Sequence, residues 1–233
     1  MKPNARRQRG ATLMEFVIVF PLAALLVLGL IQAGFVYMAK LTLNHATFMA
    51  ARVGATHNAD VATMRAALNR GLIPFHQNNF ETNDSKRLAL ALVSVKANDL
   101  IPYRRAELTR LNPSPQSFAD FGVKDPKVKA TYIPNDNLEW RTTAVGAQSQ
   151  QNLRDANLLK IRVVYGYELK VPLMAGIIKR VMCSGSSAVE AWGDVSVLQS
   201  AYKLAHPHCL YFLNDRMPIE STAIVEMQSP AYQ

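Results

Sequence analysis

The sequence predicts an α+β fold in which a long N-terminal helix packs against a small antiparallel sheet, with additional helices around it. An apolar run over residues 16–31, FVIVFPLAALLVLGLI, opens a helical pattern that continues well beyond it. Apolar and polar residues alternate over residues 159–171, as they do in a strand with one solvated face. The predicted strands are few and show no β-α-β rhythm, which favours antiparallel pairing and a layer of helix on sheet.

The apolar run is long enough to cross a membrane. Between Arg9 and Lys40 the only charged side chain is Glu15, and a spanning helix needs about 20 apolar residues. Basic residues gather on one side of the run, at Lys2, Arg6, Arg7 and Arg9. Because the basic side of a span stays in the cytoplasm, we expect a single-pass protein of the inner membrane with a cytoplasmic N-terminus. Residues from about 40 onward would then lie in the periplasm.

The helical pattern continues past the predicted span as a stripe of apolar and small residues. The spacing of three and four residues predicts one amphipathic helix from Ala11 to about Ala55, roughly 65–70 Å long. The small side chains allow another element to approach closely, either the protein's own globular domain or a neighbouring subunit. The stripe consists of Val36, Ala39, Leu43, Ala46, Ala50 and Val53.

More helix is expected directly after this first one. Asn58 or Asp60 can cap a second helix, which Gly71 and Pro74 would end. Residues 75–85 are polar and indicate a loop, whereas residues 86–98 fit a strand or a helix and their Ala and Leu content favours helix. Four prolines then predict an irregular, turn-rich connection over residues 112–134, namely Pro113, Pro115, Pro126 and Pro134.

The clearest strand covers residues 159–171 and is expected to end at Pro172. A second strand is predicted after Pro218, with Ile219, Ala223, Val225 and Met227 on one face. Residues 105–111 and 189–198 are weaker strand candidates.

Composition and charge argue against several classes of function. The chain has 26 Lys and Arg against 17 Asp and Glu, but without the first ten residues the balance falls to 22 against 17, or +5, so we expect no nucleic-acid partner. The sequence lacks a phosphate-binding P-loop, a nucleophile elbow and a zinc-protease motif. We therefore expect no catalytic residues, no bound cofactor and no enzyme activity.

The two cysteines, Cys183 and Cys209, lie in the part predicted to be exported, where a disulfide is more common than free thiols. Such a bond would stabilise the fold by about 3–4 kcal/mol on the chain-entropy estimate. Metal binding by Cys209 with His206 and His208 is the alternative, although no second cysteine pair or carboxylate lies nearby in the sequence.

Glu15 is the least expected residue of the apolar segment. A charged carboxylate in a membrane span costs several kcal/mol unless it is paired. It lies five positions after Gly10, so cleavage after that glycine would create a new N-terminal amine at Ala11, one helical turn from the carboxylate. In a stack of parallel helices, the carboxylate of one subunit could also meet the amine of its neighbour.

This arrangement resembles the TadE-like pseudopilins of tight-adherence (Flp-type) pilus systems. The resemblance covers about residues 6–55 and is carried by Gly10, Ala11, Glu15, Phe16 and Pro21, together with the stretch AARVGA at residues 50–55. It implies cleavage between Gly10 and Ala11 by a prepilin peptidase, a role in assembly for Glu15, and a minor structural role in a pilus machine. The implied partners are the peptidase, other pseudopilins and the pilin, the inner-membrane pilus platform and membrane lipid.

The resemblance divides the chain into four parts. Residues 1–10 are a basic leader, 11–35 the transmembrane half of the helix, 36–58 its amphipathic extension, and 59–233 an exported α+β domain that could also enter the fibre. The alternatives are a cleaved secretory signal, a signal-anchored periplasmic enzyme or binding protein with a concave pocket, and a pseudopilin of another type IV or type II secretion system.

Overall fold

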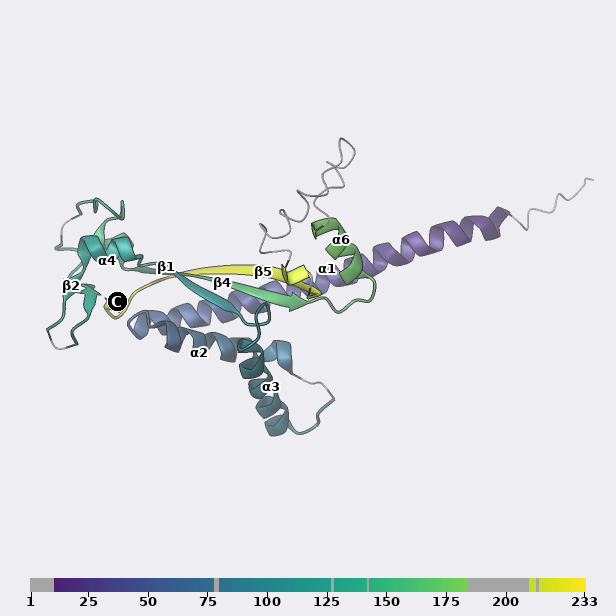
Figure 1. Ribbon diagram of the computed structural model, residues 1–233, viewed down its shortest axis with the longest axis horizontal. Helices are drawn as coiled ribbons and strands as arrows, with labels where there is room; N and C mark the ends of the chain where they lie inside the picture. Colours follow the sequence, from purple (N-terminus) through teal and green to yellow (C-terminus); the bar gives the residue numbers. More distant parts are fainter. Residues whose placement is uncertain (1–10, 78–79, 127, 142, 184–209, 213) are drawn as a thin grey trace, which may run out of the picture. The chain divides into compact units, whose positions relative to one another are not determined.

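A computed structural model describes residues 11–77, 80–126, 128–141, 143–183, 210–212 and 214–233 (Figure 1). The chain divides into two compact units. The smaller unit combines residues 1–37 with 169–215, and the larger combines residues 38–168 with 216–233. Helices and two antiparallel three-stranded sheets confirm the predicted α+β fold.

The first helix, α1, covers Ala11–Thr56 and confirms the predicted long helix almost to the residue. Its part within the larger unit buries one stripe. The predicted stripe is confirmed, with Val36 and Val53 at its partly exposed ends, and the fully buried members are Ala39, Leu43, Ala46 and Ala50. The amphipathic extension therefore packs on the protein's own fold.

The small residues of this stripe bring α1 close to α2, Val61–Gly71. A Cβ atom built on Gly71 would lie 2.6 Å from the Cβ and 2.8 Å from the Cα of Ala46, so only glycine fits between the two backbones. A Cβ atom on Gly54 would similarly lie 2.4 Å from the Sδ atom of Met64 and 2.8 Å from Leu159 on the sheet. The glycines allow α1 to contact both α2 and the sheet at van der Waals distance.

Helix α2 begins where the sequence predicts. The Oδ2 atom of Asp60 accepts a hydrogen bond from the backbone N–H of Thr63 at 2.9 Å, and this bond lowers the pKa of the aspartate. Met64 and Leu68 are buried on one side of the helix. Asp60, rather than Asn58, is therefore the capping residue.

A 3₁₀ turn, η1 at Ile73–His76, follows α2, and α3 covers Asp84–Asp99 with Asn83 as its cap. The preference for helix over residues 86–98 is confirmed. The predicted loop over residues 75–85 is shorter than expected at both ends. Pro74 lies in the first turn of η1, which extends to His76, and Asn83 already caps α3.

Sheet A has the order β1-β4-β5 and is antiparallel throughout. The central strand β4, Leu158–Glu168, lies between β1, Glu107–Asn112, and β5, Arg216–Glu226. The predicted alternation is confirmed, because the odd-numbered residues from Leu159 to Tyr167 are buried. The strand ends before Val171 because its last hydrogen-bonded pair joins Glu168 to Arg216.

Strand β5 begins earlier than predicted. Pro218 pairs with Gly166 inside the ladder instead of preceding the strand. A proline has no N–H to donate, and β5 tolerates it because it is an edge strand whose other side has no ladder partner in sheet A.

The prediction of an irregular connection over residues 112–134 was wrong in part. This region contains α4, Pro115–Phe121, and two short strands, β2 at Val123–Lys124 and β3 at Thr131–Ile133. Pro115 occupies the first turn of α4, where the missing N–H has no intrahelical partner, and Ser114 and Ser117 form a capping box. Sheet B has the order β2-β3-β6, and β6 covers Ala231–Tyr232.

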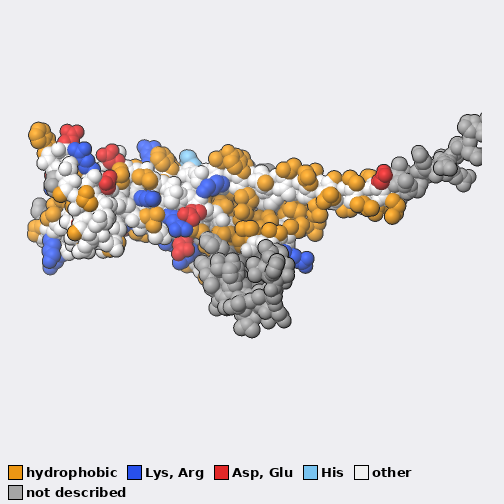
Figure 2. Space-filling model, turned by 90° about the horizontal axis from the view of Figure 1, so that it is seen from above, with side chains coloured by type: hydrophobic (Ala, Val, Ile, Leu, Met, Phe, Trp, Pro, Cys, Tyr) orange, Lys and Arg blue, Asp and Glu red, His pale blue; other side chains and the backbone are white. Residues whose placement is uncertain are grey.

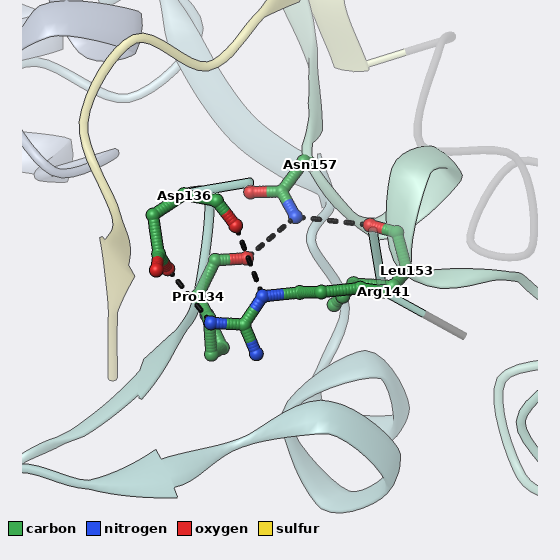
Figure 3. Close-up of polar contacts among 5 residues, drawn as sticks. All are labelled: Pro134, Asp136, Arg141, Leu153 and Asn157. Carbon is green, nitrogen blue, oxygen red and sulfur yellow. Dashed lines mark hydrogen bonds and ion pairs between the residues drawn. The ribbon is translucent and has the colours of Figure 1, made fainter. Parts of the chain in front are cut away.

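A buried asparagine fixes the entry into β4 (Figure 3). The Nδ2 atom of Asn157, which follows the short helix α5, Leu153–Ala156, donates to the carbonyl oxygens of Pro134 at 3.0 Å and Leu153 at 2.9 Å. Nearby, the exposed guanidinium of Arg141 bonds the carboxylate of Asp136 at 2.8 Å and the Asp136 carbonyl at 2.9 Å.

The C-terminal residues hold the end of α1. The carbonyl oxygen of Ala55 accepts hydrogen bonds from the backbone N–H groups of Gln228 at 2.9 Å and Ser229 at 3.0 Å. The side chain of Asn58 donates to the carbonyl of Pro230 at 2.8 Å. Segments more than 170 residues apart in the sequence thus close the larger unit.

In the smaller unit, the helix α6 covers Met174–Cys183, a helix that the sequence patterns did not indicate. The strand predicted at 189–198 lies outside the described residues.

Replacing Gly71 with alanine is expected to lower the free energy of unfolding by about 1–3 kcal/mol, because the new methyl group forces α2 away from Ala46. Gly176→Ala in α6, where no atom lies within 4 Å, is the matched control and should not destabilise the protein. Chemical denaturation of the full chain in detergent, followed by circular dichroism, measures both. Equal stability of the two variants would contradict the close helix contact.

Asn157→Ala is expected to cost about 1–3 kcal/mol, because the carbonyl oxygen of Pro134 loses its side-chain donor and that of Leu153 keeps only the backbone N–H of residue 157. Arg141→Ala removes an exposed ion pair and should cost less than about 1 kcal/mol. The same denaturation assay compares them, and a larger loss for Arg141→Ala would refute the assignment of the structural role to the buried amide.

Candidate assembly interface

The predicted functional residues lie at the start of α1. The helix begins at Ala11, so Glu15 lies four residues into it, on the same face and about 6 Å further along the axis. The Glu15 side chain is exposed, and within the described part of the chain it has neither an ion pair nor a hydrogen bond. A positive group at the helix start would be the nearest partner for its carboxylate.

An apolar surface surrounds this carboxylate. Five consecutive residues, Phe16 to Phe20, are exposed by 62%, 56%, 68%, 60% and 57%. Successive helix positions point 100° apart, so five in a row cover every side of the helix. Figure 2 shows hydrophobic side chains along this part of α1. No side of this segment is covered by the described part of its own chain, so it requires lipid or other helices around it.

Length and composition agree with this requirement. Among the described residues, one helix is long and apolar enough to cross a membrane, and it is the N-terminal one. That single helix is consistent with a single-pass membrane anchor.

Pro21 lies inside α1 without ending it. Because proline lacks an N–H, the carbonyl oxygen of Val17 loses its usual helical donor. One turn earlier, the rings of Phe16 and Phe20 stack with their centroids 5.2 Å apart. The early part of the helix thus combines a carboxylate, an aromatic pair and one unpaired backbone carbonyl on an otherwise apolar rod.

Sequence reasoning missed the role of Gln32, the first polar residue after the apolar run. Its side chain is 2% exposed, and its Oε1 atom accepts a hydrogen bond from the backbone N–H of Val171 at 3.0 Å. Its Nε2 atom is buried and has no partner among the described residues. A polar residue at the end of an apolar run was the available signal, but the contact with residue 171 has no local sequence pattern.

Several predicted site residues fall outside the described part of the chain. These are Gly10, Cys209, His206 and His208, together with the side chain of Cys183. The cleavage junction, the disulfide and the alternative metal site therefore stay predictions. Among the described residues, no group of three or more His, Cys, Asp or Glu side chains comes together to hold a metal ion.

Residues 10–52 match the family model of TadE-like proteins. The N-terminal segment is therefore similar to TadE-like proteins. The match contains Gly10, Ala11, Glu15 and Pro21 and ends at Arg52, within the buried part of α1. No curated protein and no solved structure matches the chain significantly.

Proposed function

We propose that the protein is a pseudopilin, a minor structural component of a tight-adherence pilus machine rather than an enzyme. The observation that carries the proposal is the position of Glu15, the single charged side chain in a helix segment that is exposed and apolar on all sides. A membrane anchor alone has no use for this carboxylate, whereas assembly of parallel helices does.

In this proposal a prepilin peptidase cuts between Gly10 and Ala11, and the new amine of Ala11 neutralises Glu15. Within one subunit the two groups lie one helical turn apart. Between neighbouring subunits, the same pair sets how far one helix is displaced along the next. Since charge pairing strengthens as the surroundings become less polar, the lipid core makes this register selective.

The TadE-like match supports the partners. The pseudopilin would contact the peptidase, other pseudopilins and the pilin, and the inner-membrane platform. The basic residues before the span support a cytoplasmic leader and an extracytoplasmic larger unit.

Gly10→Leu is expected to block processing, because a bulky side chain occupies the peptidase position next to the scissile bond. In a host with the active peptidase, immunoblotting should show only the full-length chain. Gly34→Leu places the same side chain on an open part of α1 and should be cut normally. Efficient cutting of Gly10→Leu at the same junction would refute the assigned site.

Glu15→Ala is expected to leave membrane insertion intact and to reduce incorporation into the pilus machine by about tenfold or more. The expected size follows from a charged hydrogen bond worth roughly 1.5–3 kcal/mol. Co-purification with the other pseudopilins measures incorporation, and carbonate extraction measures insertion. Glu15→Gln separates charge from shape and should behave like Glu15→Ala; normal assembly of both variants would disprove the pairing.

A further inference from the structure

In the smaller unit, the start of α6 contacts the end of the apolar part of α1. The hydrogen bond between Gln32 and the backbone of Val171 holds the chain just before α6. The Sδ atom of Met174, at the start of α6, lies 3.9 Å from where a Cβ atom on Gly29 would be, which is ordinary van der Waals contact. Gly29 and Gln32 are three residues apart and share one face of α1.

This attachment places α6 at a defined depth. The apolar run of α1 covers residues 16–31, about 24 Å at 1.5 Å per residue, and Gln32 is the first polar residue after it. If α1 spans the membrane over residues 11–35, as the proposed function requires, Gln32 lies within one helical turn of the end of the span. The start of α6 then lies at the same membrane boundary.

Next to Met174, α6 carries an apolar stripe that is largely exposed. Leu173, Ile177 and Val181 are spaced by four residues and form one stripe, exposed by 68%, 41% and 68%. Leu173 has φ = 68°, a backbone conformation that leucine rarely adopts, yet its side chain points outward and has no covering among the described residues.

The charge around this stripe has one sign. Lys170, Lys179 and Arg180 are the only charged residues between 169 and 183, and no acidic residue occurs there. Since helix positions advance by 100° per residue, Arg180 lies at the edge of the stripe away from the buried Met174, and Lys179 lies on the other side of the helix. A helix with an apolar side and a basic side is the type that lies in the interface of an anionic bilayer.

We propose that α6 is a membrane-surface helix, seated among the anionic phospholipid headgroups of the leaflet from which α1 emerges. Leu173, Ile177 and Val181 enter the boundary of the acyl chains, and the three basic side chains bind lipid phosphates. With α1 upright in the bilayer and α6 lying flat, the smaller unit has two attachments to the membrane. This inference rests on the membrane span of the proposed function but not on cleavage or pilus assembly.

The test uses the full chain with both cysteines intact, reconstituted in vesicles of phosphatidylethanolamine and phosphatidylglycerol. A phospholipid with a diazirine at the top of its acyl chain is photoactivated, and mass spectrometry maps the adducts. We expect adducts on residues 171–182 as well as on residues 14–31. Lys179→Glu with Arg180→Glu should reduce the first set by at least about fivefold, the factor expected from one basic side chain near an anionic surface.

The matched control replaces Lys124 and Lys129, which are exposed in the larger unit, with glutamate. It should change the number of adducts neither on residues 171–182 nor on residues 14–31. Adducts on residues 14–31 without adducts on 171–182 would overturn the inference about α6 and leave the membrane span standing. Such a result would mean that protein, either residues 184–209 or a second copy, covers the stripe. Absence of both sets would refute the span itself, and with it the proposed function.

Discussion

The carboxylate of Glu15, which has no partner within the described part of the chain, constrains the surroundings of the first turns of α1. Glu15 lies on a helix whose neighbouring residues are apolar and exposed in every direction, so the surroundings of this segment must be apolar. A carboxylate in such surroundings is stable only next to a positive group. The chain offers no basic side chain between Arg9 and Lys40, and an amine at Ala11 would supply the missing charge at the distance of one helical turn. Proteolytic cleavage and assembly are, in this view, two consequences of the same electrostatic requirement.

Helix α1 lies in two different environments along its length. Residues 16–20 are exposed on every side of the helix within the described part of the chain, whereas residues 39–55 present a narrow stripe of alanines and glycine to α2 and the sheet. Gly71 and Gly54 permit contacts that any larger residue would prevent, and the hydrogen bonds from Gln228 and Ser229 to Ala55 hold the end of the helix. The rigid attachment of the later part leaves the earlier part free to associate with lipid or with other helices.

Periodic features of the fold could be predicted from the sequence, and features that depend on distant partners could not. The stripe from Val36 to Val53 and the alternation from Leu159 to Tyr167 are strictly repetitive, so one buried face identifies each element. The prolines led to wrong predictions, because Pro115 starts α4 and Pro218 lies within an edge strand. Proline is tolerated at both positions because an N–H group there would have no hydrogen-bond partner in the helix or sheet. The structural role of Gln32 could not be predicted because its hydrogen-bond partner, Val171, is 139 residues away in the sequence. In the candidate site, Glu15 could be predicted because a charge interrupts an apolar run. The exposed stripe on α6 could not, because the sequence does not show that Met174 is buried while Ile177 is exposed.

The most direct test of the central claim is the intact mass of the wild-type protein purified from membranes that contain an active prepilin peptidase. We expect a chain that begins at Ala11 with a free amine, the group that pairs with Glu15. A chain that still carries residues 1–10 under these conditions would have no amine at that position, and the pairing on which the proposed function depends would not exist.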